Sequence, residues 1–205
     1  MRIVGISGAQ GGGKTSLLNE LKLRGYEVDE FKVSRAVQAQ LGWKSLDSVM
    51  DNFSTMVTFQ DEVYNQKLEN DLSFSTNGRP GLILTERTFA DVFAYAQLWA
   101  YKLMYRGDVP EMEGLRWVNE YYRKCAEAQV KCYAGTLLLP LMNHVKFEDD
   151  PHRAKKEDVQ RVYEEVQRFC DLAKYRGHKS FAITQMTVEH RANEVEGLLK
   201  MVAPA

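Results

Sequence analysis

The chain has little of what marks secreted, membrane or strongly basic proteins. Its three cysteines, Cys125, Cys132 and Cys170, are odd in number and lack metal or redox spacing, so we expect buried, reduced thiols of a cytosolic protein. No apolar run reaches membrane length, and Met1-Arg2 leads directly into the first apolar stretch, so neither a membrane span nor a signal peptide is expected. The net charge of −1 argues against a wholly basic nucleic-acid binder and leaves room for a local basic groove.

The sequence also lacks the segments that usually separate domains. The 205 residues contain no repeat, low-complexity tract or linker. A hydrophobic content of 44% and a charged content of 27% are ordinary for a soluble globular protein. We therefore expect a single domain over residues 1–205, large enough for a substantial core.

The most informative motif stands at the start of the chain. Residues Arg2–Ser7 are mostly apolar and predict a buried strand, and Gly8–Thr15 follow with GAQGGGKT, which fits G-x-x-x-x-G-K-[ST] at every fixed position. Leucines at helical spacing come next, so the glycines stand at a helix N-terminus, where backbone N–H groups can surround a phosphate. Lys14 can reach the β- and γ-phosphates of a nucleoside triphosphate, and the Thr15 hydroxyl can bind Mg²⁺. The alternative, an ordinary glycine-rich turn, leaves Lys14 and Thr15 unexplained. The predicted nucleotide-binding residues are Gly8, Ala9, Gln10, Gly11, Gly12, Gly13, Lys14, Thr15 and Ser16.

Strand and helix patterns alternate along the rest of the chain. Further strands are expected at 26–28, 81–85, 136–140 and 181–184. Helices are expected at 34–41, over 46–72 as one helix or two, at 89–105, 113–130, up to 174, and at 188–202, with a loop at 73–80. This alternation implies a parallel sheet covered on both faces. It predicts an α/β fold with a five-stranded parallel sheet in a three-layer α/β/α sandwich. Together with the glycine-rich motif this resembles the P-loop NTPase fold, and that resemblance implies a helical lid.

Carboxylates follow two of the predicted strands. Asp29 and Glu30 come at the end of the second strand, where open α/β sheets place ligands. A hydroxyl acceptor must lose a proton during transfer whereas a phosphate is already ionised, so a base here favours a hydroxyl acceptor. The alternative is a helix N-cap with an acidic first turn. Glu86 ends the next strand, where a P-loop protein keeps its metal-directed carboxylate.

A polar, charged segment comes late in the chain. Residues 143–158, NHVKFEDDPHRAKKED, carry Arg153, Lys155 and Lys156 and lead into a charged helix. The segment is a candidate lid over the nucleotide. The alternative is the solvated start of a helix.

With these features in hand, the chain resembles the P-loop nucleoside and nucleotide kinases, and in detail the deoxynucleoside kinases. Glu86-Arg87-Thr88 is similar to their Glu-Arg-Ser motif, in which the acid serves the metal and the arginine the transferring phosphate. Phe59-Gln60 looks like their Phe-Gln pair, whose glutamine reads a base edge. The alternative for Phe59 is an ordinary core aromatic at helical spacing.

The same resemblance implies a base and a lid arginine. Asp29-Glu30 occupy the place of the family's general-base glutamate, but Phe31 stands where that family usually has a proline. Both acids therefore remain candidates. Arg153 would be the lid arginine.

A second resemblance is to small phage-encoded kinases, among them those that phosphorylate 5-hydroxymethyluracil within DNA. It rests on 29–37 (DEFKVSRAV), 84–96 (LTERTFADVFAYA) and 149–159 (DDPHRAKKEDV). It implies the 5-hydroxymethyl group of a base in DNA as acceptor, and such a base would have to be flipped or single-stranded. Duplex binding would need a basic rim, for which the available residues are Lys102, Arg106, Arg123, Lys124, Lys131, Lys155 and Lys156.

We therefore predict an ATP- and Mg²⁺-dependent phosphotransferase that acts on a hydroxyl of a pyrimidine nucleoside-type acceptor, with 5-hydroxymethyluracil in phage DNA as a specific candidate. The alternatives are a free deoxynucleoside or nucleoside monophosphate kinase, and an ATPase switch. The chain lacks a guanine-reading Asn-Lys-x-Asp, an arginine-finger partner domain and an Asp-Glu pair at the Glu86 strand, which disfavours the switch.

The predicted site residues fall into three groups. The catalytic group is Lys14, Asp29, Glu30, Glu86, Arg87 and Arg153. The acceptor group is Phe31, Arg35, Phe59, Gln60 and Arg87, and the metal group is Thr15 and Glu86. The expected partners are ATP and an acceptor that is free or part of DNA, with a homodimer left open and no membrane. The expected location is the cytoplasm, that of the host if the protein is phage-encoded.

Overall fold

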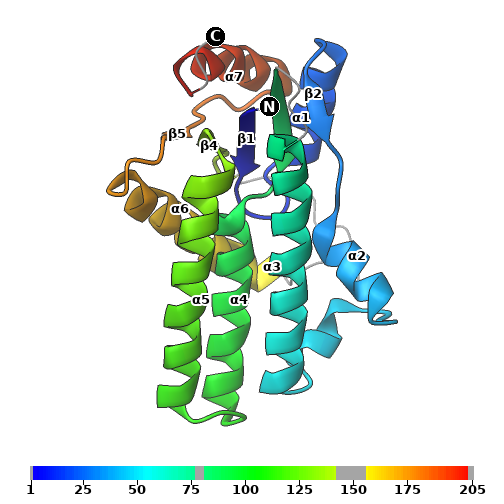
Figure 1. Ribbon diagram of the computed structural model, residues 1–205, viewed down its shortest axis with the longest axis vertical. Helices are drawn as coiled ribbons and strands as arrows, with labels where there is room; N and C mark the ends of the chain where they lie inside the picture. The colour runs from blue at the N-terminus through cyan, green and yellow to red at the C-terminus, as the bar shows by residue number, and fades with distance from the viewer. Residues whose placement is uncertain (1, 77–80, 142–155, 203–205) are drawn as a thin grey trace.

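A computed structural model describes residues 2–76, 81–141 and 156–202 (Figure 1). The strands are β1 (Arg2–Ser7), β2 (Glu27–Asp29), β3 (Leu82–Glu86), β4 (Gly135–Leu138) and β5 (Ser180–Ala182). The α-helices are α1 (Lys14–Leu23), α2 (Val33–Gln40), α3 (Phe53–Thr76), α4 (Phe89–Arg106), α5 (Glu111–Cys132), α6 (Val159–Lys174) and α7 (Val188–Val202). Two short 3-10 helices, η1 (Leu46–Met50) and η2 (Lys156–Asp158), complete the described elements.

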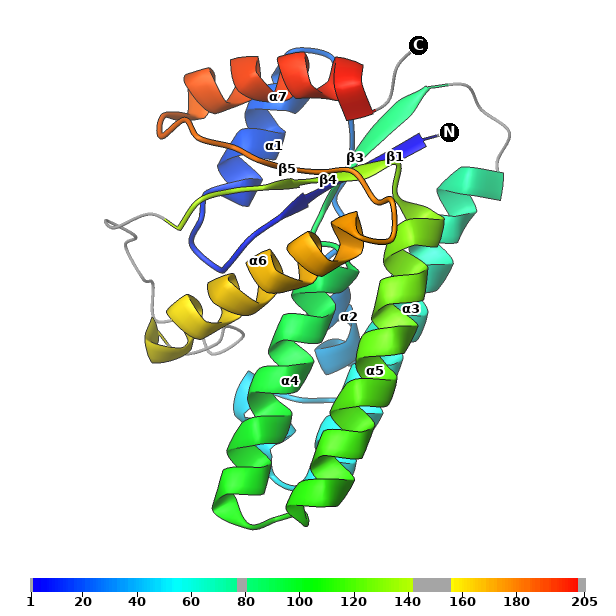
Figure 2. The same cartoon turned by 90° about the vertical axis from the view of Figure 1, so that its left-hand side faces the viewer.

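The five strands form one parallel sheet in the order β2-β3-β1-β4-β5. The central strand β1 is buried on both faces. Val4 and Ile6 pack toward α1 and α7, whereas Ile3 belongs to a second core on the opposite face, as the two-residue period of a strand requires. Figure 2 shows α1 and α7 on one side of the sheet and α3, α4, α5 and α6 on the other. The predicted three-layer α/β fold with a five-stranded parallel sheet is confirmed.

A glycine in β1 lets helix α4 begin close to the central strand. A Cβ atom on Gly5 would lie 2.1 Å from Cγ2 of Thr88, the N-cap residue of α4. No side chain fits in that space. The start of α4 therefore packs directly against β1, the strand that leads into the glycine-rich loop.

The long helices differ from the sequence prediction at their ends. Residues 46–72 contain η1 and then α3 alone, and the side chain of Asn52 marks the break by accepting a hydrogen bond from the backbone N–H of Thr55 at 2.9 Å. The predicted loop at 73–80 is wrong for residues 73–76, which continue α3. Leu72 packs against the core and Asp71 is fully buried. These tertiary contacts hold the end of the helix, which local composition does not reveal.

The three cysteines are free thiols and all are buried, as predicted. Burial raises the pKa of Cys170 to about 12 and that of Cys132 to about 11, with nearby acids adding to the shift. These thiols therefore stay protonated at neutral pH. No helix in the described part of the chain combines the length and apolar character that crossing a membrane requires.

Candidate active site

The glycine-rich loop between β1 and α1 has the backbone that its sequence requires. Gly8 has φ +140° and Gly13, the N-cap residue of α1, has φ +82°. These conformations strain residues with side chains. A Cβ on Gly8 would also lie 3.1 Å from the carbonyl oxygen of Leu139, which follows β4. The loop is therefore packed against the sheet, with α1 beginning at Lys14.

Lys14 is folded back onto this loop. Its Nζ donates hydrogen bonds to the carbonyl oxygens of Gly8 at 2.5 Å and Ala9 at 2.8 Å. Burial, together with the charge of Arg87, lowers the pKa of Lys14 to about 8 despite the opposing carboxylates. The residue is thus a buried cation whose partners are neutral carbonyls. An anionic phosphate would be a stronger partner for it.

Thr15 and Glu86 meet at the mouth of the loop. The Thr15 hydroxyl donates a hydrogen bond of 3.2 Å to Oε2 of Glu86, and Lys32 forms an ion pair with the same oxygen. Burial raises the pKa of Glu86, but the charges of Lys14, Lys32 and Arg87 outweigh it and hold that pKa below its ordinary value. Glu86 is therefore an ionised carboxylate at neutral pH.

This oxygen set fits Mg²⁺. Among the described residues there is no group of three or more His, Cys, Asp or Glu side chains that could hold a metal. Mg²⁺ in phosphoryl-transfer sites needs only one or two protein oxygens, because substrate phosphates and water supply the remainder. Thr15 and Glu86 match that requirement.

A cavity of about 420 Å³ opens in front of the loop. Its walls come from the glycine-rich loop, from the start of α2 and from the end of β3. It is lined by Gln10, Gly11, Gly13, Lys14, Thr15, Ser16, Phe31, Lys32, Val33, Ser34, Arg35, Glu86 and Arg87. We call it the phosphate cavity. The predicted residues Phe31 and Arg35 lie here, beside the loop.

A second, mostly apolar cavity adjoins it. It is lined by Gln10, Val33, Ser34, Leu46, Phe59, Gln60, Val63, Arg87, Asp91, Val92, Tyr95 and Trp99, and we call it the aromatic cavity. Gln10, Val33, Ser34 and Arg87 line both cavities. The aromatic cavity has about 40 Å³ of free volume in this structure, room for only a few water-sized groups. A larger ligand would have to displace side chains.

Arg87 stands where the two cavities meet. Its backbone has φ +69°, the only positive value at a non-glycine residue in the described chain. Such a conformation is costly, and backbone strain of this kind clusters at active sites and ligand-binding segments. The guanidinium carbon lies 5.0 Å from the centroid of the Tyr95 ring, close enough for a cation–π contact. The sequence analysis assigned Arg87 both to the catalytic group with Glu86 and to the acceptor group. In the structure Arg87 lines both cavities and so lies beside residues of both groups.

Phe59 and Gln60 project from α3 and are both buried. One face of Phe59 stacks on Trp43 at 5.2 Å and 16°, and Trp99 approaches it edge-on at 5.9 Å. The backbone carbonyl of Gln60 accepts a hydrogen bond of 2.6 Å from Tyr121. Phe59 therefore serves as core and as cavity wall at once. A role in the core and a role in the acceptor site are therefore compatible for this residue.

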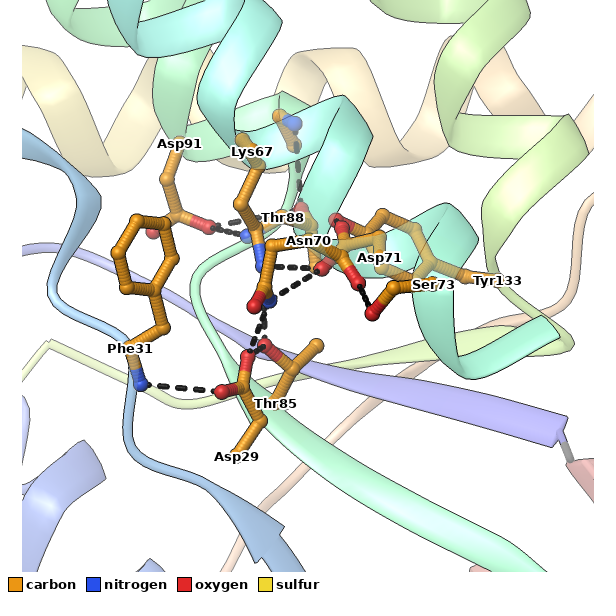
Figure 3. A network of polar contacts seen from close by, with 11 residues as sticks. Asp29, Phe31, Lys67, Asn70, Asp71, Ser73, Thr85, Thr88, Asp91 and Tyr133 are labelled. Carbon is orange, nitrogen blue, oxygen red and sulfur yellow. Dashed lines mark hydrogen bonds and ion pairs between the residues drawn. The ribbon is translucent and has the colours of Figure 1, made fainter. Parts of the chain in front are cut away.

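Asp29 does not line either cavity. Its Oδ1 accepts a hydrogen bond from the backbone N–H of Phe31 at 3.0 Å, and its Oδ2 accepts from Asn70 at 2.9 Å and from Thr85 at 3.0 Å (Figure 3). The carboxylate thus ties the end of β2 to β3 and α3. This placement suits positioning better than proton transfer.

Glu30 also lies apart from the cavities. It is exposed, and its Oε1 lies 2.6 Å from Nζ of Lys22 on α1. A hydrogen bond and the charge of Lys22 hold the pKa of Glu30 below its ordinary value. The N-cap residue of α2 is Lys32, so neither acid takes the capping role weighed as the alternative.

The contacts of Asp29 continue into a buried polar network that the sequence analysis did not identify. Nζ of Lys67 lies 2.9 Å from Asp71 and 2.9 Å from the hydroxyl of Thr85, and Tyr133 donates to Asp71 at 2.5 Å (Figure 3). Burial and the neighbouring carboxylate raise the pKa of Tyr133 well above its usual value. The network fixes Thr85, the residue immediately before Glu86.

Asp91 forms a second connection that sequence reasoning missed. It is fully buried and accepts hydrogen bonds from the Ser7 hydroxyl at 2.5 Å, from the Gly8 N–H at 3.2 Å and from the Thr88 N–H at 2.8 Å. The last of these contacts belongs to a capping box that starts α4. The signal was present as Thr-x-x-Asp before an apolar run. Asp91 therefore links α4 to the first glycine of the loop.

Other sequence predictions meet different outcomes. Phe89, the first residue of α4, is fully buried against Tyr64 and Tyr133 and lines neither cavity. Arg153, Lys155 and most of the candidate lid at 143–158 lie outside the described residues. Their roles stay predictions.

A family model described as an AAA domain matches residues 3–191. A search of curated proteins gives no significant match. Among solved structures, deoxyadenosine kinase from M. mycoides with dCMP and dCDP has a TM-score of 0.67 at 13% identity, over 97% of this chain and 99% of that one.

Two further structures share the fold. Thymidylate kinase from Candida albicans has a TM-score of 0.67 at 11% identity, over 98% of this chain and 91% of that one. A NadR protein in complex with NAD and AMP-PNP has a TM-score of 0.64 at 16% identity, with 98% of this chain covered. This chain spans about half, 49%, of the NadR chain. The predicted P-loop nucleoside and nucleotide kinase fold is confirmed.

Proposed function

This chain belongs to the AAA domain family, and from that premise we propose that it is an ATP- and Mg²⁺-dependent phosphotransferase with a nucleoside-type acceptor. The observation that carries the proposal is the meeting of the two cavities at Arg87. One cavity has the phosphate-binding loop and the other has aromatic and amide walls. A γ-phosphoryl group held in the first would face an acceptor held in the second.

Charge in the phosphate cavity suits this transfer. Phosphoryl transfer depends mainly on positioning and on neutralising the charge of the phosphoryl oxygens. Lys14 would exchange its carbonyl partners for phosphate oxygens, and Arg87 would face the group in transit. Thr15 and Glu86 would hold Mg²⁺, which neutralises phosphate charge when bound. The nucleotides in the structures of similar fold, AMP-PNP in NadR and dCDP in deoxyadenosine kinase, support a nucleotide at this loop.

The aromatic cavity supports a base-containing acceptor. Gln60 carries both a donor and an acceptor on its amide, and Phe59, Tyr95 and Trp99 provide flat apolar walls. Such walls favour a planar ring. The similar folds of enzymes named for deoxyadenosine and thymidylate are consistent with a nucleoside-type acceptor here.

The finer proposal is a hydroxyl of a pyrimidine group, with the 5-hydroxymethyl group of a uracil base in DNA as one candidate. It rests on the similarity of Glu86-Arg87-Thr88 to the deoxynucleoside-kinase motif and on the resemblance of the segments 29–37, 84–96 and 149–159 to small phage-encoded kinases. A free deoxynucleoside and a nucleoside monophosphate are the alternatives. Because Asp29 and Glu30 have partners away from the cavities, a hydroxyl acceptor would depend on positioning and charge more than on either acid.

An acceptor screen tests the proposal. The protein is incubated with γ-labelled ATP and, separately, with nucleosides, monophosphates or hydroxymethylated DNA, and the products are digested to locate the label. Lys14→Ala is the control for a contaminating kinase. Label on a base hydroxymethyl, a sugar hydroxyl or a monophosphate identifies the acceptor, and only the DNA reaction should weaken steeply with salt. ATP hydrolysis without label on any acceptor would overturn the proposal in favour of an ATPase.

A further inference from the structure

Arg191 connects α7 to the phosphate-binding loop from behind. Its side chain is only 1% exposed. Nη1 donates a hydrogen bond of 2.8 Å to the carbonyl oxygen of Gly12, and Nε donates one of 2.8 Å to the carbonyl oxygen of Gln185, in the connection between β5 and α7. One guanidinium therefore joins the loop to the connection between β5 and α7.

Among the described residues, no carboxylate contacts this buried cation. Within residues 2–76, 81–141 and 156–202, its Nη2 is buried without a hydrogen-bond partner and the guanidinium forms no ion pair. Glu194 is near enough to act on it electrostatically. However, the Glu194 oxygens accept hydrogen bonds from Thr184 and Gln185. Burying a charge without a contacting counter-charge costs folding free energy. This cost indicates that Arg191 has a role at the loop beyond packing.

The contact with Gly12 sets the direction of a peptide group. In a trans peptide the carbonyl of Gly12 and the N–H of Gly13 point in opposite directions. Because Arg191 holds the carbonyl from the α7 side, it turns the N–H of Gly13 the other way. Gly13 lines the phosphate cavity, so that N–H is available to a phosphate oxygen.

We propose that Arg191 is a positioning residue that orients the phosphate-binding loop and supplies it with a buried positive charge that bound phosphates compensate. The proposal rests on the nucleotide binding proposed above. It differs from the role of Lys14, because Arg191 acts through the loop backbone. Arg191 should therefore matter for ligands in proportion to their phosphate charge.

The test compares Arg191→Met and Arg191→Lys with wild type. Calorimetry measures the Kd of ATP, of ADP and of adenosine, with thermal unfolding measured alongside. Arg24→Met is the matched control, since Arg24 also reaches α7, through Glu196 at 3.2 Å, without contacting the loop. It removes an equal charge at the α1–α7 contact.

We expect Arg191→Met to weaken ATP binding by about tenfold or more, equivalent to about 1.4 kcal/mol. The same substitution should weaken ADP binding less and should change adenosine binding little. Arg191→Lys keeps the charge but not the planar fork, so it should fall between wild type and Met. It remains informative if the Met variant does not fold. Arg24→Met should leave all three Kd values unchanged.

Two results would overturn the inference. In the first, Arg191 variants bind ATP as tightly as wild type and differ only in melting temperature, which would make Arg191 a purely structural contact and leave the proposed function standing. In the second, ATP and adenosine lose affinity equally, which would exclude a phosphate-directed role. If wild type itself binds no ATP, both this inference and the proposed function fail.

Discussion

The hydroxyl of Thr15 and the carboxylate of Glu86 lie 3.2 Å apart although the two residues are 71 positions apart in the chain. Parallel pairing of β1 with β3 sets this distance, because Ile6 is opposite Glu86 in the register. The loop then carries Thr15 back over the ends of both strands. Two motifs recognised separately in the sequence thus become one candidate metal site.

We expect Glu86→Gln to lower turnover and Mg²⁺ affinity by about 10- to 100-fold, the usual effect of altering a residue that holds a metal or its water. A neutral amide is a poorer partner for metal-bound water than a carboxylate. The measurement is a Mg²⁺ titration of activity at saturating ATP. Glu30→Gln, which removes an exposed acid paired with Lys22, is the control. An unchanged Mg²⁺ midpoint would show that Glu86 is structural.

The sequence predicted the parts of the site that are continuous in the chain. The phosphate-binding loop is a local motif, and Glu86-Arg87 follows a recognisable strand, so both could be located without a structure. The role of Asp29 could not be located in this way. It depends on β2 pairing with β3 and on Asn70 of α3 reaching the strand end. Arg191 was missed because its partner, Gly12, is 179 positions away.

Asp29→Asn should destabilise the fold by about 1–3 kcal/mol, the usual cost of leaving a buried polar group unsatisfied. The new amide nitrogen would face a donor in Phe31, Asn70 or Thr85. Urea unfolding measures the loss, with Glu30→Gln as a control that should cost almost nothing. The pH–rate profile of Asp29→Asn should keep the shape of the wild-type profile. Loss of its acidic limb would instead identify Asp29 as the general base.

The Lys14 ammonium makes nucleotide affinity depend on pH. Burial lowers its pKa to about 8 in the free protein, and bound phosphate favours the charged form. ATP affinity should therefore fall as pH rises above about 8. Lys14→Ala should bind weakly, lose transfer activity and show no such fall. Kd values measured from pH 7 to pH 10 check this, and parallel curves for the two proteins would contradict it.

The lowered pKa of Lys14 also makes the free energy of unfolding depend on pH. Between its folded pKa of about 8 and the ordinary lysine pKa of 10.5, the unfolded chain holds a proton on Lys14 that the folded chain lacks. Stability from this site therefore rises with pH across that window and is lowest below it. The free energy of unfolding of wild type relative to Lys14→Ala should increase from pH 8 to pH 10.5. A decrease would show that Lys14 is more stable charged than neutral in the fold.

Gln60 offers the cleanest separation of acceptor recognition from folding. Phe59→Ala would be ambiguous, because removing a buried aromatic costs about 3–5 kcal/mol whatever its role. Gln60→Leu, by contrast, leaves the backbone carbonyl that accepts the hydrogen bond from Tyr121. We expect it to lower kcat/KM for the acceptor by about tenfold or more, since an unmatched polar edge of a bound base is costly, while KM for ATP stays unchanged. Gln66→Leu, which removes an exposed side-chain hydrogen bond from α3 to Gln40 of α2, is the control. Equal kinetics for Gln60→Leu and wild type on every acceptor would show that Gln60 only fills the core. That result would contradict the proposal that the aromatic cavity holds the acceptor base.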